Sequence, residues 1–79
     1  MKAYVVVYEH RSTGTHTDIF KEKRAAELLA LENMMDDMIH WGRGADEIAS
    51  CVYELLRDGQ TQWGESNAMS VEHKEIAIS

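Results

Sequence analysis

The chain has 79 residues, which limits it to one domain over residues 1–79, because so short a chain buries only about 60% of its unfolded surface. Hydrophobic residues make up 44% and charged residues 28%, and there is no proline, which is typical of a folded globular domain. Eight Lys and Arg stand against 14 Asp and Glu, and the net charge of −6 repels a nucleic-acid backbone. The composition therefore excludes large catalytic architectures and argues against direct binding of nucleic acid.

The composition also bears on the compartment. The single cysteine, Cys51, cannot form an internal disulfide, and the N-terminus lacks the basic, apolar and small-residue order of an export signal. The longest purely apolar run falls far short of the ~20 residues that cross a bilayer. We therefore expect a cytoplasmic protein that does not enter a membrane.

The first 20 residues predict a β-hairpin. Residues 3–10 are rich in β-branched and aromatic side chains and end at a turn in which Gly14 can adopt a positive φ. Residues 16–20 resume with β-formers that partly alternate between polar and apolar, which suits a return strand.

Two helices are predicted next. The segment from Lys23 to His40 consists largely of Ala, Leu, Glu and Met, which are strong helix formers, and it meets no breaker before Gly42. Residues 45–58 recover a helical spacing of apolar residues, and Gly59 is the expected terminator of this second helix.

A helical wheel assigns an expected core face to the first helix. One arc carries Leu28, Leu31, Met35, Met38 and Ile39. The other side carries Asn33, Asp36, Asp37 and His40. We expect the first set to pack on the sheet and the second set to face solvent.

The last twenty residues show a weaker pattern. Residues 60–67, Gln60 to Asn67, contain turn formers and no clear period, which indicates a loop. Residues 71–78 suggest a closing strand, although Val71 and Ile76 do not share a face unless a bulge intervenes. The assembled prediction is a two-layer α+β fold in the order β-β-α-α-β, with a three-stranded antiparallel sheet and two helices packed on one face.

The first strand is apolar on both faces. Residues 3, 5 and 7 point one way and residues 4, 6 and 8 the other, while helices on one side cover only one face. Two interpretations of the second face stay open. Either its tyrosines are partly exposed, or a homodimer closes through Tyr4, Val6 and Tyr8.

Charge is distributed unevenly. Between Ala25 and Leu56 there are seven acidic residues and one basic residue, Arg43, so this helical segment carries −6. The functional interpretation is an acidic face that docks on a basic protein surface, and the alternative is a solvated face that promotes solubility. The candidate partner-binding residues are Glu32, Asp36, Asp37, Asp46, Glu47 and Glu54.

Two tryptophans and four histidines are further candidates. Trp41 and Trp63 are candidate aromatic anchors for a partner. The histidines, at positions 10, 16, 40 and 73, raise the hypothesis of a metal site at the hairpin, in a register that places His10 across from His16, with Glu9 or Asp18 as third ligand. No compact ligand motif accompanies them, so we expect neither a metal nor a cofactor.

No catalytic residue is nominated. Cys51 lies on the apolar stripe of the second helix, where a thiol behaves as a small hydrophobe rather than as a nucleophile. The chain offers no Gly-rich phosphate loop and no Ser, His and Asp constellation.

The hairpin sequence also carries a resemblance. Residues 5–11, followed by Gly14-Thr15 and residues 18–20, resemble the opening of small proteins from bacteria, phages and mobile elements. The size, acidity and α+β layout are similar to those of anti-CRISPR and other anti-defence proteins, which inhibit their targets by occupying a protein surface. The resemblance implies a phage-encoded inhibitor, a non-catalytic module whose acidic helical face docks on a basic nucleic-acid-binding surface of a protein partner. The alternatives are a homodimeric structural module and a small histidine-containing metal-binding protein.

Overall fold

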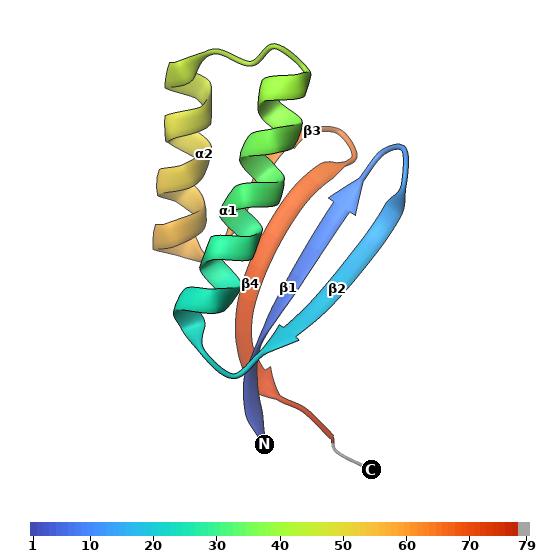
Figure 1. Ribbon diagram of the computed structural model, residues 1–79, viewed down its shortest axis with the longest axis vertical. Helices are drawn as coiled ribbons and strands as arrows, with labels where there is room; N and C mark the ends of the chain where they lie inside the picture. The colour runs from blue at the N-terminus through green and yellow to red at the C-terminus, as the bar shows by residue number, and fades with distance from the viewer. Residues whose placement is uncertain (78–79) are drawn as a thin grey trace.

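The computed structural model describes residues 1–77 as one antiparallel sheet with two helices on one of its faces (Figure 1). The elements are β1 (Lys2–His10), β2 (Gly14–Phe20), α1 (Lys23–His40), α2 (Ala45–Asp58), β3 (Gln60–Gly64) and β4 (Asn67–Glu75). The strand order is β2-β1-β4-β3, so the first and last strands of the chain lie next to each other at the centre of the sheet.

The hairpin and both helices lie where the sequence predicts them. Gly14 opens β2 with a φ of 84°, and α1 spans Lys23–His40. Gly59 ends α2 in the left-handed conformation, with a φ of 77°, and its N–H donates to the Leu55 carbonyl at 2.9 Å. A residue with a Cβ adopts this conformation only at a cost, which explains a glycine at the end of the helix.

The predicted three-stranded sheet is wrong, because the sheet has four strands. The segment predicted as a loop contains β3, which pairs with β4 and shifts register between Gln62 and Gly64. β4 begins at Asn67 rather than at Val71 and ends at Glu75, and residue 78 of the predicted strand lies outside the described residues. The prediction missed β3 because the strand has only five residues and ends at Gly64, so the alternation of the buried Thr61 and Trp63 is short, and the strand pairs with β4.

The helices cover the face of the sheet that carries the even-numbered residues of β1. Val6 lies in the core, and Tyr4 and Tyr8 pack against it. The predicted dimer face therefore lies on the side of the sheet that the helices cover, where Val6 is buried and Tyr4 and Tyr8 are partly buried. On the other face Ala3 and Val5 are also buried, because β1 is a central strand with β2 on one side and β4 on the other.

The face that α1 turns to the sheet also differs from the wheel prediction. The buried residues are Ala26, Ala30, Met34, Asp37 and Met38. Of the predicted core residues Met38 is buried and Leu31 is partly buried, whereas Leu28, Met35 and Ile39 are exposed. The alanines allow α1 to approach the sheet closely, and the flexible methionines fill the space that remains.

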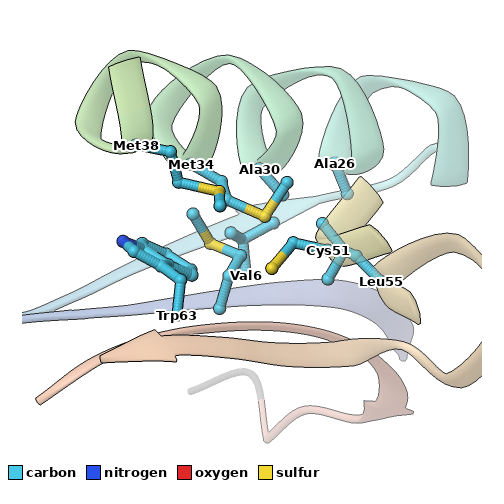
Figure 2. Packing of buried hydrophobic residues seen from close by; sticks show 9 residues of the cluster. Val6, Ala26, Ala30, Met34, Met38, Cys51, Leu55 and Trp63 are labelled. Carbon is cyan, nitrogen blue, oxygen red and sulfur yellow. The ribbon is translucent and has the colours of Figure 1, made fainter. Parts of the chain in front are cut away.

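The core forms between the helices and the sheet. Figure 2 shows Met34 and Met38 reaching down from α1 toward Val6 and Trp63, while Cys51 and Leu55 enter from α2. Cys51 is a free, buried thiol.

Candidate functional site

Large hydrophobic side chains are exposed on the side of the helices that faces away from the sheet. In α1, Leu28, Met35 and Ile39 are 57%, 37% and 61% exposed, and their i, i+7, i+11 spacing places them in one stripe. In α2, Tyr53 and Leu56 are 63% and 46% exposed. We call these five residues the outer helical face.

The exposed stripe of α1 borders the contact between the two helices. Glu27 of α1 lines the same shallow depression as Leu55 and Leu56 of α2. The flank of α1 that carries Glu27 therefore faces α2. On the helical wheel, Met35 and Leu28 lie about 80° and about 100° from Glu27, in the direction away from the sheet. Both residues therefore lie on the solvent side of the contact between the helices. The helical spacing therefore places the outer helical face along the solvent side of the seam between α1 and α2.

Three of the predicted acidic residues lie beside the outer helical face. Glu32 and Asp36 are i, i+4 neighbours on the exposed flank of α1, and Asp46 lies in the exposed first turn of α2. Within residues 1–77 none of the three carboxylates has a cationic group within 4.0 Å. We call these three residues the acidic rim. Like charges at i, i+4 cost a few tenths of a kcal/mol, so Glu32 and Asp36 do not stabilise the isolated helix.

The other three predicted acidic residues are engaged within the protein. The Glu47 carboxylate pairs with Arg43 at 3.0 Å, and Glu54 accepts a hydrogen bond from the Thr61 hydroxyl at 2.8 Å. Asp37 is only 7% exposed and points to the sheet. The acidic surface is therefore smaller than the sequence indicated.

Asp37 connects α1 to two strands. Its Oδ2 accepts the indole N–H of Trp63 at 2.7 Å, and its Oδ1 lies 2.9 Å from Nε2 of His10. Nδ1 of His10 accepts the backbone N–H of Ser12 at 3.1 Å, so in the neutral imidazole Nε2 carries the proton and donates it to Asp37. Because both ring nitrogens of His10 are engaged, this group holds α1 on the sheet and offers no free general base.

The sequence contained one signal for a buried Asp37. This residue falls on the same arc of the helical wheel as Ala26, Ala30 and Met34, so a single acid interrupts a stripe of small and apolar side chains. An acid in that position requires partners from another element.

The carboxylate of Asp37 also acts on Tyr8, which lies below α1. Burial, followed by the negative charges of Asp37 and Asp36, raises the pKa of Tyr8 above its ordinary value of 10.0. The phenol is therefore held in its neutral form.

The two predicted aromatic anchors have different environments. Trp63 is 6% exposed and belongs to the core. Trp41 is 50% exposed at the end of α1, with the Arg11 guanidinium 5.7 Å from its ring centroid. Only Trp41 is accessible to a ligand or partner.

The hairpin register does not place His10 opposite His16. His10 pairs with Gly14, and His16 pairs with Tyr8 and contacts the Thr13 hydroxyl at 2.9 Å. Among residues 1–77, no group of three His, Cys, Asp or Glu side chains lies close enough together to hold a metal ion.

One arginine, whose charge is paired with a carboxylate, lies beside the outer helical face. The Arg57 guanidinium lies 5.0 Å from the ring centroid of Tyr53 and pairs with Asp58 at 2.7 Å. The hydrogen bond from Arg57 lowers the pKa of Asp58 below its usual value. The charge of this arginine is therefore not available to offset the acidic rim.

Comparisons with known proteins do not assign the chain to a family. No protein-family model, no curated protein and no solved structure matches the chain. In the described part of the chain, neither helix combines the length and the apolar character needed to cross a bilayer.

Proposed function

We propose that the protein is a non-catalytic interaction module that docks its outer helical face on a partner protein. The observation that carries this proposal is the exposure of five large hydrophobic residues along one seam, beside three carboxylates that have no cationic partner among residues 1–77. Monomeric proteins rarely expose extended apolar patches with a polar rim unless another molecule covers them. Burial of the outer helical face supplies affinity, and the carboxylates supply orientation and a faster encounter.

The charge of the surface favours a basic partner over a second copy of the chain. A symmetric contact through the outer helical face brings Glu32 and Asp36 of both copies to one interface, in a protein with a net charge of −6. Like charges in contact oppose association, whereas Lys and Arg around an apolar centre attract the rim. The partner is therefore expected to present apolar residues surrounded by basic ones.

The resemblance to anti-defence proteins supports a more specific version of this proposal. The basic surface of the partner is one that normally receives nucleic acid, and docking blocks it. Neighbouring carboxylates such as Glu32 and Asp36 present repeated negative charge, as a nucleic-acid backbone does. The protein is then an inhibitor that occupies a site instead of modifying it.

The test compares two matched substitutions of exposed isoleucines. Ile39→Lys places a cation in the outer helical face, whereas Ile19→Lys makes the same change on β2, where Ile19 is 56% exposed and lies away from the helices. The partner is captured from a lysate of the native host with the wild-type chain, identified, purified and titrated against both variants. We expect Ile39→Lys to weaken binding by at least about tenfold and Ile19→Lys to leave it unchanged. Equal affinity of Ile39→Lys and wild type contradicts the proposal.

The acidic rim is tested separately with salt. The double variant Glu32→Gln/Asp36→Asn is expected to weaken binding at low salt and to reduce its salt dependence, because exposed charges are screened over ~8 Å at physiological ionic strength. Salt-independent binding by the wild type removes the rim from the proposal. Sedimentation of the purified chain tests whether the surface binds a second copy instead. If the wild type forms a concentration-dependent dimer and Ile39→Lys abolishes it, the occupant of the outer helical face is a second copy of the chain and not a basic partner.

A further inference from the structure

Three turns of the chain meet at the end of the molecule that lies away from both termini (Figure 1). They are the β1–β2 turn, the α1–α2 turn and the β3–β4 turn, and together they line a half-open cavity of about 470 Å³. This volume lies within the roughly 300–1,000 Å³ of typical small-molecule sites. The lining residues are Arg11, Trp41, Arg43, Trp63 and residues 64–67, and we call this cavity the turn pocket.

The lining of the turn pocket differs in charge from the rest of the protein. It combines two arginines with the exposed Trp41 and the largely buried Trp63, in a protein with a net charge of −6. Glu65 is the one carboxylate among the residues that line it. The turn pocket therefore brings the guanidinium of Arg11 and the exposed indole of Trp41 together in one concavity.

Arg43 is held rigidly in this wall. Its Nη2 donates to the backbone carbonyl of Trp63 at 2.8 Å, and its Nη1 pairs with Glu47 at 3.0 Å. The two contacts orient the guanidinium, and Glu47 compensates its charge, so Arg43 shapes the wall and leaves Arg11 as the cation available to a ligand.

Arg11 is the free cation of the turn pocket. Within residues 1–77 no carboxylate lies within 4.0 Å of its guanidinium, which instead lies over the exposed indole of Trp41. The backbone at this point is fixed, because the Arg11 N–H donates to Oδ1 of the buried Asn67 at 3.1 Å. A guanidinium presents a planar fork of N–H donors that matches a carboxylate or a phosphate.

We propose that the turn pocket binds a small anion that carries a planar aromatic ring, of the size of a nucleoside monophosphate. The anionic group accepts hydrogen bonds from Arg11, and the aromatic ring packs against the indole of Trp41. Glu65 opposes the anion and limits its affinity. This site does not depend on the outer helical face, so the failure of either proposal leaves the other intact.

The binding test follows the two indole N–H resonances of the ¹⁵N-labelled protein during titration. The probes are AMP, which carries a phosphate, and indole-3-acetate, which carries a carboxylate. Adenosine supplies a ring without an anion, and inorganic phosphate supplies an anion without a ring. We expect at least one of the two aromatic anions to shift the Trp41 resonance with a Kd of about 0.1–1 mM, and both partial probes to bind about tenfold more weakly or less. The stronger of the two aromatic anions identifies the anionic group.

Matched variants assign the binding to the turn pocket. Arg11→Gln is expected to weaken binding about tenfold, whereas Arg24→Gln, the same charge change in the first turn of α1 at the other end of the molecule, leaves it unchanged. Glu65→Gln is expected to tighten binding about two- to threefold, and Glu72→Gln on β4 is its control. Misfolding would weaken binding, so tighter binding by Glu65→Gln reports the removal of its charge.

Three outcomes overturn the proposal. The first is the absence of any shift with AMP and indole-3-acetate up to about 10 mM, well above the expected range. The second is equal affinity of Arg11→Gln and Arg24→Gln. The third is equal binding of the partial probes and the complete anions.

Discussion

Replacement of Asp37 by Asn is expected to destabilise the protein far more than the same replacement at its neighbour Asp36. Asp37 accepts two hydrogen bonds, from Trp63 and His10, and an asparagine has only one side-chain oxygen with which to accept them. In either orientation of the amide, its NH₂ group faces a second donor. His10 cannot relieve this clash by changing tautomer, because a proton on Nδ1 would then face the N–H of Ser12.

The magnitude follows from the burial of these groups. A hydrogen bond to a charged group is worth about 1.5–3 kcal/mol, and a buried donor without a partner adds a desolvation cost. The variant Asp37→Asn is therefore expected to lose about 2–4 kcal/mol of the free energy of unfolding. A chain of this length has a total of about 4–12 kcal/mol, at about 0.05–0.15 kcal/mol per residue. The corresponding fall in Tm is about 8–32 °C, at about 4–8 °C per kcal/mol for a domain of this size.

Urea denaturation, followed by circular dichroism, measures both variants. Asp36 is exposed, so Asp36→Asn makes the same charge change and is expected to alter the free energy of unfolding by no more than about 0.5 kcal/mol. A double-mutant cycle of Asp37→Ala with Trp63→Phe isolates the indole bond and is expected to give a coupling of about 1.5–3 kcal/mol. If Asp37→Asn and Asp36→Asn prove equally stable, or the coupling is near zero, the buried group does not hold α1 on the sheet.

Three further predictions concern the glycine cap, the core face of α1 and Tyr8. Gly59→Ala is expected to cost more than Gly42→Ala in urea denaturation, because both have positive φ but only a Cβ at Gly59 meets a backbone carbonyl oxygen, at 3.0 Å; equal costs would show that this contact relaxes. Met38→Ala is expected to cost about 2–5 kcal/mol, whereas Ile39→Ala stays within about 0.5 kcal/mol, and the reverse order would restore the wheel prediction. Because the pKa of Tyr8 is raised above 10.0 in the folded protein, the unfolded chain loses that proton first, so the free energy of unfolding falls as pH rises above 10.0. Tyr8→Phe is expected to decline less over the same alkaline range, and an identical decline would contradict the assignment.

Only part of the candidate sites could be predicted from the sequence. The uneven charge along the chain predicted an acidic helical layer, and in the described part of the chain three of the six predicted residues lie exposed without a cation within 4.0 Å. The charge pattern could not reveal that Asp37 points inward, because a wheel drawn for one helix contains no information about the strands beneath it. The turn pocket was also out of reach, since Arg11, Trp41 and Asn67 come from three turns far apart in the chain.

Short-range chemistry was sufficient for the hairpin, for the two helices and for the glycine at the end of α2. Helix propensity, turn residues and caps act between residues a few positions apart, so a linear pattern contains them. The fourth strand and the rotation of α1 depend on contacts over long separations. Asp37 meets His10 and Trp63 across 27 and 26 residues, and β3 exists as a strand because β4 offers it a partner. α1 has apolar side chains on two sides, and the side that packs on the sheet is the one on which Asp37 forms its buried hydrogen bonds with His10 and Trp63.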